Sequence, residues 1–595
     1  FFLSRIDSAV DEQLEANGSA EALALRGRTA IANAKLAYQH FQRAFSGPRW
    51  QALAERGARP QRVLWASTST KDPDYPDTMY VDELIGPHTV NTLPPSTLHA
   101  FLDHGRVAET VTAGLDEAER VLAQLPEQGV DLDAVCNQVL EEGIEKFDKP
   151  YRALMGAIGA KVSQLRAGAG FLDADLGSYE ETAAEAAAGL EDNRILARIW
   201  RHDHTVWSQA PAEISNRLGW LHLPEKMDER LGRIAALADS LRSDGIRRAV
   251  LLGMGGSSLA PDVFSHVFGP VHDGLRLEVL DTTAPAAILA QVERLDAART
   301  LFIVSTKSGT TVETLSAFKY FYNQVAQALG EGAAGGHFVA ITDPGSQLVE
   351  LAAEYDFRAT LLNDPDLGGR YSALSYFGLA PAGLIGVDLE RLLERAETMA
   401  HNNQSCNAPQ AGDNAGQRLG AILGALAGAG RDKLTLVASD ALANFGDWVE
   451  QLIAESTGKA GKGILPVVGE PLGAPAVYGQ DRLFVHLRLA DDDRYDRPLA
   501  ALAGAGHPLL TLHLNDRYDL GGQFFLWEMA TAVAGHLLGI QPFNQPNVEA
   551  AKERARELVA AYQKEGHLPA GESAEPSAGA LAAFLKQARP GDYIA

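Results

Sequence analysis

Along most of this chain, short apolar segments rich in β-branched residues alternate with longer amphipathic stretches, and this pattern limits the possible folds most strongly. Parallel strands need crossover connections, usually helices, so the alternation predicts parallel sheets covered by helices. At 595 residues the chain exceeds the usual size of one domain, and we expect at least two. The expected strands are residues 61–67, 88–92, 248–253, 275–281, 301–305, 337–342, 433–438 and 483–488.

A glycine- and alanine-rich passage interrupts this pattern near residue 170. It begins with Arg166-Ala-Gly-Ala-Gly170 and continues into an alanine-heavy stretch, a composition that favours an inter-domain connection. Upstream of it, residues 96–104 are expected to form a helix between two barrel strands. The strands downstream suit a doubly wound parallel sheet, which binds ligands at the carboxyl ends of its strands.

Residues 301–325 read as a strand, a hydroxyl-rich turn and the start of a helix. Thr310 and Glu313 have the spacing of a capping box. The hydroxyls of the turn belong to Thr306, Ser308, Thr310 and Thr311. They exceed what a cap requires, and a helix N-terminus attracts phosphate dianions. We therefore favour an anion site over the alternative, an ordinary N-cap.

A second informative stretch, residues 448–459, places Glu455 in the last turn of a helix that stops at Gly458. The unpaired carbonyls of that turn disfavour a negative charge, which suits a carboxyl group that passes protons near neutral pH. Arg370 and Lys459 could counterbalance this effect if they lie close. The alternative is a solvated helix end.

Several motifs, taken in order, resemble the glucose-6-phosphate isomerase family. They are Gly253-Met-Gly-Gly-Ser-Ser-Leu-Ala-Pro261, Ser305-Thr-Lys-Ser-Gly-Thr-Thr311, Gly368-Gly-Arg-Tyr-Ser372, Glu455-Ser-Thr-Gly-Lys459 and Asn544-Gln-Pro-Asn-Val-Glu-Ala-Ala-Lys552. The resemblance covers residues 190–595. It implies conversion of glucose 6-phosphate to fructose 6-phosphate through a cis-enediolate, with no cofactor and no metal.

The resemblance also implies roles for individual residues. Glu455 would move the proton between C1 and C2, and Arg370 would stabilise the enediolate oxygen. Lys552 would assist ring opening or binding, although it also reads as a helix-surface lysine. Gln451, one turn before Glu455, either orients the substrate or is simply a polar helix residue. The other expected substrate contacts are Gly256, Ser257, Thr306, Lys307, Ser308, Thr310, Thr311 and Gln545.

The N-terminal part resembles the last third of a bacterial transaldolase. The similar segments are residues 2–7, 30–38, 64–71 and 83–92. Arg5 matches the phosphate-binding arginine of that family and would be a binding remnant. Ser69 stands where other transaldolases place an arginine, and Lys71 could assist there. In that family the Schiff-base lysine lies upstream, so transaldolase activity is expected only of a longer protein.

As a whole, the chain resembles the bifunctional transaldolase/phosphoglucose isomerase fusion and reads as an internal fragment of it. We expect an α/β fold, with part of a (β/α)8 barrel in residues 1–165 and a linker at 166–190. Two doubly wound parallel-sheet subdomains follow at 191–400 and 401–595, with the active site between them. The ring-opening histidine is expected beyond residue 595, so we expect weak or no turnover from these residues alone. The histidines that we expect to be structural are His202, His204 and His486.

Composition excludes several function classes. A net charge of −25 argues against nucleic acid or an anionic membrane as partner. Cys136 and Cys406 have no metal-ligand spacing, which is typical of a reducing, cytoplasmic protein. No apolar run is long enough to span a bilayer, and residues 491–493 read as a solvated acidic loop. The expected partners are small sugar phosphates, and an oligomer is possible.

Two alternatives from other classes stay open. Gly253–Ser258 after a strand, with Asp281 ending the next strand, suggests an NAD(P)-dependent oxidoreductase. That fingerprint, however, prefers glycine or alanine where Ser258 stands. The other alternative is a regulator that binds sugar phosphates without catalysis, against which the pairing of Glu455 with Arg370 argues.

Overall fold

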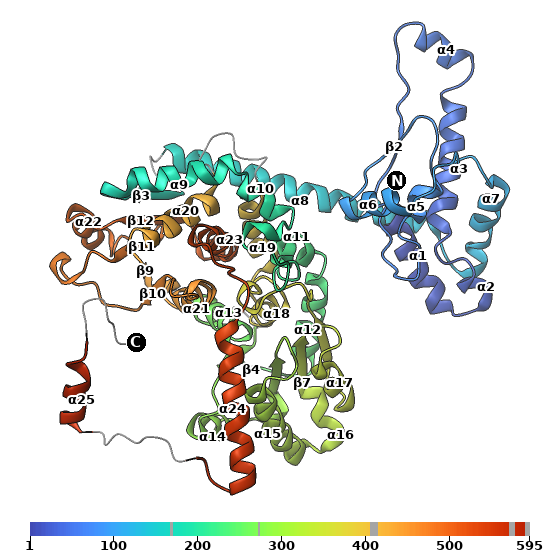
Figure 1. Ribbon diagram of the computed structural model, residues 1–595. Coiled ribbons are helices and arrows are strands. Elements are labelled where there is room, and N and C mark those ends of the chain that lie inside the picture. Colours follow the sequence, from blue (N-terminus) through green and yellow to red (C-terminus); the bar gives the residue numbers. More distant parts are fainter. Residues whose placement is uncertain (167–170, 272–273, 405–413, 570–576, 589–595) are drawn as a thin grey trace. The chain divides into compact units, whose positions relative to one another are not determined.

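The computed structural model describes residues 1–166, 171–271, 274–404, 414–569 and 577–588 (Figure 1). The chain divides into two compact units, Phe1–Gly156 and Ala157–Ala595. In the described parts of the chain, no helix is both long and apolar enough to cross a membrane.

The first unit is mainly helical around one short parallel strand pair. β1 (Val63–Trp65) pairs with β2 (Thr89–Asn91), and Phe2 makes an isolated parallel bridge to Ala66. Both strands fall where the apolar pattern predicts them, and α6 fills the predicted helix. The helices are α1 (Leu3–Asn17), α2 (Ala20–Leu23), α3 (Thr29–Ala44), α4 (Pro48–Ala54), α5 (Met79–Asp82), α6 (Pro95–His104), α7 (Leu115–Gln124) and α8 (Leu132–Arg166), which continues into the second unit.

The first sheet of the second unit is wholly parallel, in the order β5-β4-β6-β7-β8. Its strands are β4 (Arg248–Gly253), β5 (Arg276–Leu280), β6 (Thr300–Ser305), β7 (Phe338–Thr342) and β8 (Ala359–Leu362). Successive strand residues point to opposite faces. Ala249 and Leu251 of β4 therefore enter one hydrophobic core, and Val250 and Leu252 enter another. Burial on both faces explains the continuous apolar runs.

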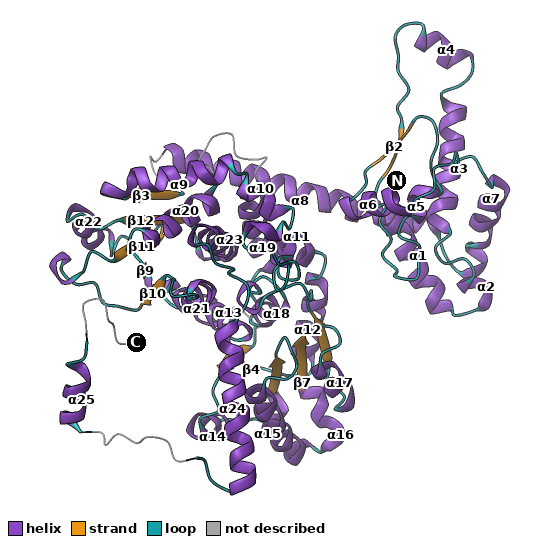
Figure 2. Cartoon of the chain, in the orientation of Figure 1, coloured by secondary structure: helices purple, strands orange, loops and turns teal. Residues whose placement is uncertain are grey.

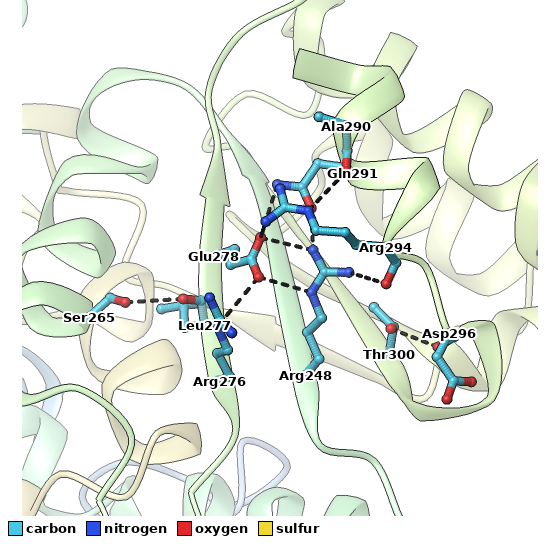
Figure 3. Close-up of polar contacts among 10 residues, drawn as sticks. All are labelled: Arg248, Ser265, Arg276, Leu277, Glu278, Ala290, Gln291, Arg294, Asp296 and Thr300. Carbon is cyan, nitrogen blue, oxygen red and sulfur yellow. Dashed lines mark hydrogen bonds and ion pairs between the residues drawn. The ribbon is translucent and has the colours of Figure 1, made fainter. Parts of the chain in front are cut away.

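Helices flank this sheet, as Figure 2 shows. They include α12 (Leu231–Ser243), α13 (Leu259–Phe268), α14 (Pro285–Glu293), α15 (Val312–Leu329), α16 (Glu331–Ala334), α17 (Gln347–Glu354) and α18 (Tyr376–Leu384). Where β4 and β5 begin, the Glu278 carboxylate accepts from Arg248 (Nη2–Oε2 2.9 Å) and from Gln291 (Nε2–Oε2 3.1 Å) (Figure 3). Burial alone would raise the pKa of Glu278, but these bonds lower it. This network links the N-terminal parts of β4 and β5, toward the edge of the sheet opposite the predicted site.

The second sheet has the order β10-β9-β11-β12-β3, with only β3 antiparallel to its neighbour among the described pairs. Its strands are β3 (Leu172–Asp175), β9 (Lys433–Ala438), β10 (Leu465–Val468), β11 (Arg482–Leu489) and β12 (Leu509–Leu514). The remaining helices are α9 (Glu180–Asp192), α10 (Ile195–Trp200), α11 (Leu223–Asp228), α19 (Leu389–Asn402), α20 (Ala415–Gly428), α21 (Phe445–Thr457), α22 (Asp496–Gly504), α23 (Leu520–Leu538), α24 (Pro546–Glu565) and α25 (Ala578–Leu585).

The linker predicted at residues 166–190 differs from the structure. Its described part contains β3, an edge strand of the second sheet, and most of α9, which buries Ala183 and Leu190. Alanine is the best helix former, so an alanine-rich stretch folds as readily as it links. The second sheet therefore takes one strand from before residue 191 and is not confined to residues 401–595.

At the centre of the second unit, α23 is buried nearly all round. Glycines let α20 approach it closely: a Cβ on Gly420 would stand 2.7 Å from the carbonyl oxygen of Ala530. This packing supports the elements that carry the site.

Candidate functional site

Two turns predicted to bind substrate lie side by side at the carboxyl edge of the first sheet. β4 and β6 are neighbours, with Gly253 opposite Ser305. The 3₁₀ turn η5 (Gly255–Ser257) follows β4, and the threonine turn 306–311 follows β6. Ser305 Oγ donates a hydrogen bond to the carbonyl of Ser257 at 3.1 Å. The parallel register thus brings the glycine and threonine turns together, as predicted.

The turn after β4 requires glycines, because the backbone of Gly369 and the side chain of Gln451 approach it closely. A Cβ on Gly256 would overlap the carbonyl group of Gly369, in the 3₁₀ turn η8 (Gly369–Tyr371). Gly255 has a φ of +55°, and a Cβ there would stand 2.7 Å from Gln451 Nε2. The predicted site residues Gly256 and Gln451 therefore lie around one turn, beside the backbone of η8.

The threonine turn leads into α15, and the N-terminus of this helix has no side-chain cap. Thr306 Oγ1 lies 2.9 Å from Thr311 Oγ1, and Ser308 Oγ accepts from Thr310 N at 3.2 Å. The predicted capping box with Glu313 is wrong: Thr311 is the N-cap of α15, and no side chain caps this helix. Its first amides therefore have no side-chain acceptor, which leaves them suited to an anion.

Lys307 is held by one partner that follows β7 and one that follows β8. Its Nζ forms an ion pair with Asp343 and donates to the carbonyl of Pro365 at 3.2 Å. Burial raises the pKa of Asp343, while Lys307 opposes that rise. Lys307 thus joins the threonine turn to the β7 loop.

Arg370 is the most buried cation of the site, at 3% exposure. Its Nε donates to Ser456 Oγ at 2.9 Å, and its Nη2 donates to the carbonyl of Pro542 at 2.9 Å. Its Nη1 lies 2.8 Å from Glu455 Oε1, an ion pair whose geometry is not that of a hydrogen bond. The predicted base and the predicted enediolate-stabilising cation are therefore in contact.

Glu455 owes its position to the end of α21. The helix buries Trp448, Val449 and Leu452 on one face and leaves Gln451 and Glu455, one turn apart, partly exposed. It ends at Gly458, whose N–H donates to the carbonyl of Ala454. This is the helix end predicted from the sequence.

Lys459 is a site residue that the sequence identified only as a neighbour of Glu455. Its Nζ donates to the carbonyls of Gln541 at 2.7 Å and Asn544 at 2.8 Å. Burial, with a further contribution from Arg370, lowers the pKa of Lys459 to about 7. The sequence signal for this residue was its position directly after Gly458, which ends the helix that carries Glu455.

The late motif is described only in part. Gln545 is the N-cap of α24 and is partly buried, directly after the loop that Lys459 holds. Lys552 falls within α24, and its side chain lies outside the described residues.

In the first unit, Arg5 lies over the ring of Phe2, with 5.0 Å between Cζ and the ring centroid. Its Nη1 and the Oγ of Ser4 are buried without hydrogen-bond partners in the described chain. Adjacent buried donors without partners are consistent with the predicted anion-binding remnant.

None of the histidines expected to be structural makes contact with Glu455 or Arg370 in the described residues, and two of them have other polar partners. His202 Nε2 lies 3.2 Å from Nε2 of His222, and His204 Nδ1 lies 3.0 Å from the carbonyl oxygen of Ser208. His486 is buried in β11, where burial lowers its pKa to about 4. Within the ranges that the structure describes, no cluster of three or more His, Cys, Asp or Glu could hold a metal ion.

Two family models match the chain. Residues 1–158 match the model described as Transaldolase/Fructose-6-phosphate aldolase, and residues 231–468 match Phosphoglucose isomerase. A transaldolase from Frankia alni is 52% identical over 165 residues, which are 28% of this chain and 44% of that protein. One from Thiobacillus denitrificans is 51% identical over 158 residues, 27% of this chain and 44% of that protein. The chain thus spans less than half the length of these relatives.

Solved structures resemble about two thirds of the chain in fold. A hypothetical protein from Thermus thermophilus aligns with a TM-score of 0.56 and 24% identity, over 65% of this chain and all of that one. A glucose-6-phosphate isomerase from Chlamydia trachomatis aligns with a TM-score of 0.55 and 19% identity, over 68% of this chain and 89% of that one. At these identities the likeness establishes the fold.

Proposed function

We propose that this chain, in which residues 1–158 match the transaldolase family model and residues 231–468 match the phosphoglucose isomerase model, interconverts glucose 6-phosphate and fructose 6-phosphate. The observation that carries the proposal is the contact of Glu455 with Arg370, beside the glycine and threonine turns. A carboxylate alone would suit many sites. A carboxylate paired with a buried arginine and next to an uncapped helix suits proton transfer on a phosphorylated sugar.

In this reaction a proton leaves C2 of the open-chain aldose and returns at C1, a hydroxyl proton passes from O2 to O1, and no electron is lost to an acceptor. Glu455 takes and returns this proton, because one carboxylate can face both carbons of the planar cis-enediolate. Arg370 stabilises the negative oxygen, since its guanidinium stays charged and is already fixed by Ser456 and Pro542. The chemistry therefore needs no nicotinamide.

The phosphate of the substrate binds at the threonine turn. Thr306, Ser308, Thr310 and Thr311 supply hydroxyls there, and the uncapped N-terminus of α15 supplies amides. With Ser257 and Gln451 contacting the sugar, this remote binding positions the reacting carbons. These local donors matter because the chain as a whole carries a net charge of −25, which would repel an anionic phosphate.

Lys552 and Gln545 complete the proposed site from the late motif. We assign the protein to the cytoplasm because a chain with two cysteines is too poor in cysteine for a disulfide framework. The described contacts of Arg370, Glu455 and Lys459 include no histidine. We therefore expect ring opening, and so turnover by residues 1–595, to be slow.

The experiment that tests the proposal mixes the chain with glucose 6-phosphate and follows fructose 6-phosphate over a long incubation, with NAD+ or NADP+ added in parallel. We expect ketose to form and no nicotinamide to be reduced. Reduction of the nicotinamide would favour the oxidoreductase. Tight sugar-phosphate binding without any ketose would favour the non-catalytic regulator.

A further inference from the structure

Lys459 follows the glycine that ends α21, and its ammonium group reaches a loop distant in sequence. Its Nζ donates to the carbonyls of Gln541 and Asn544, at 2.7 and 2.8 Å. Its own N–H donates to the carbonyl of Thr457 at 2.8 Å, and its backbone forms an antiparallel bridge with Lys462. The residue is therefore fixed at both its backbone and its side-chain end.

Arg370 holds the same loop from the other side. Its Nη2 donates to the carbonyls of Pro542 at 2.9 Å and Asn544 at 3.3 Å. The Asn544 carbonyl thus accepts from both cations, and hydrogen bonds from charged donors are stronger than those between neutral groups. Between these points, Phe543 packs on the ring of Tyr371, with 5.2 Å between centroids. Loop 541–544 is thereby held against η8 and the end of α21.

The position of this loop determines where the late motif begins. Gln545 follows Asn544 directly and is the N-cap of α24. A displacement of about 1 Å at a positioning group can lower a rate about a hundredfold. A residue that fixes loop 541–544 can thus control the placement of Gln545 relative to Glu455.

Charged groups from three segments surround the Lys459 ammonium. Burial and the charge of Arg370 lower its pKa to about 7, while Glu455 and Glu213 act in the opposite direction. The phosphate group of a bound sugar, at the threonine turn of the same site, adds negative charge, which favours the protonated lysine. Near pH 7 the binding of an anionic sugar should therefore draw a proton onto Lys459 from solvent.

We propose that Lys459 is a positioning residue for the isomerase reaction, which fixes loop 541–544 together with Arg370 and takes up a proton when an anionic sugar phosphate binds. This inference rests on the proposed function. It concerns a residue that does not itself touch the reacting carbons.

The test is calorimetric titration of the full chain with glucose 6-phosphate at pH 7, in two buffers of different ionisation enthalpy. The variants are Lys459→Met, Lys459→Arg and, as matched control, Lys462→Met. Lys462 lies in the same glycine-rich loop, but its Nζ donates to the carbonyl of Leu538 at 2.6 Å. The phosphate group of the ligand titrates equally in all variants, so differences between variants report the lysine.

We expect Lys462→Met to match the wild-type chain, and Lys459→Met to bind about tenfold more weakly with less proton uptake. Lys459→Arg should restore affinity, because arginine can donate to both carbonyls, but not the lost proton uptake, because it stays charged. Wild-type proton uptake in Lys459→Arg, or equal losses in Lys459→Met and Lys462→Met, would overturn the inference. Failure of the wild-type chain to bind glucose 6-phosphate would instead overturn the proposed function.

Discussion

Arg370 Nη1 lies 2.8 Å from Glu455 Oε1. Arg370 lies in η8, after the last strand of the first sheet, whereas Glu455 lies in the last turn of α21, which follows β9 of the second sheet. This contact places the proposed proton-transfer group next to a fixed positive charge, although the two residues follow strands of different sheets. It also makes both residues sensitive to any change that shifts η8 or α21.

Replacing Arg370 by lysine should lower kcat about 10²- to 10³-fold, the usual cost of losing one preorganised charge-stabilising donor. Lysine keeps the charge but cannot reach Ser456, Pro542 and Glu455 at once, since it lacks the planar fork. Steady-state kinetics with fructose 6-phosphate measures this effect.

The control for that change is Arg482→Lys, at the start of β11. Arg482 Nη1 donates to Thr435 Oγ1 and Glu470, both at 2.8 Å, as part of the second sheet. We expect it to change stability but not kcat. Equal kcat values for the two variants would exclude the proposed role of Arg370.

Replacing Gly256 by alanine should lower kcat/KM by about a hundredfold, because the new methyl group overlaps the backbone of Gly369 and displaces η8. Gly232→Ala in α12 is the matched control, since a Cβ there meets open space. That control should be as stable as wild type or up to about 1 kcal/mol more stable. A fully active Gly256→Ala variant would show that the two turns need not pack closely.

The threonine turn can be tested by Thr306→Val, which removes one buried hydroxyl at nearly constant volume. We expect KM to rise about tenfold, equivalent to about 1.4 kcal/mol, with little change in kcat, because the phosphate is remote from the reacting carbons. Thr300→Val is the control, since its Oγ1 bonds the carbonyl of Asp296 at the other end of β6. An unchanged KM in Thr306→Val would remove this turn from the phosphate site.

His486 should make stability depend on pH. Burial lowers its pKa in the folded chain to about 4, below the ordinary value of 6.5. The unfolded chain therefore takes up the proton first, so stability is highest above about pH 6.5 and falls as pH drops towards 4. The loss is on the order of 3 kcal/mol.

Urea unfolding across this pH range measures the effect, with His486→Leu as the informative variant. We expect the substitution to flatten this part of the curve. His337→Gln, whose histidine bonds the carbonyl of Thr300, should keep it. If His486→Leu retained the full pH dependence, the loss would have to come from other groups.

The sequence predicts those strands best that are buried on both faces. β4 and β6 each contain a continuous apolar run and lie where expected, and so does β9, whose four central residues are buried. Strands at or near an edge carry weaker signals: β3 alternates Leu172 with aspartates, and β10 contains Pro466. These strands depend on neighbours that are distant in sequence, which a local pattern does not contain.

The site shows the same division. The two turns and the helix end at Glu455 have local signals, namely glycines, hydroxyl-rich residues and a glycine stop, whereas the roles of Arg370 and Glu455 were predicted from the family resemblance. The ion pair of Lys307 with Asp343 and the contacts of Lys459 with loop 541–544 could not be predicted. Both depend on tertiary packing. The capping box failed because α15 begins two residues after Thr310.

The most direct test of the proposed mechanism is exchange of the C1 and C2 protons of fructose 6-phosphate and glucose 6-phosphate with D2O, followed by NMR. The variant is Glu455→Gln, and the control is Glu450→Gln, an exposed glutamate on the same helix. We predict that the wild-type chain and Glu450→Gln incorporate deuterium, whereas Glu455→Gln still binds sugar phosphate but does not exchange. Exchange in Glu455→Gln at the wild-type rate would contradict the assignment of Glu455 as the base.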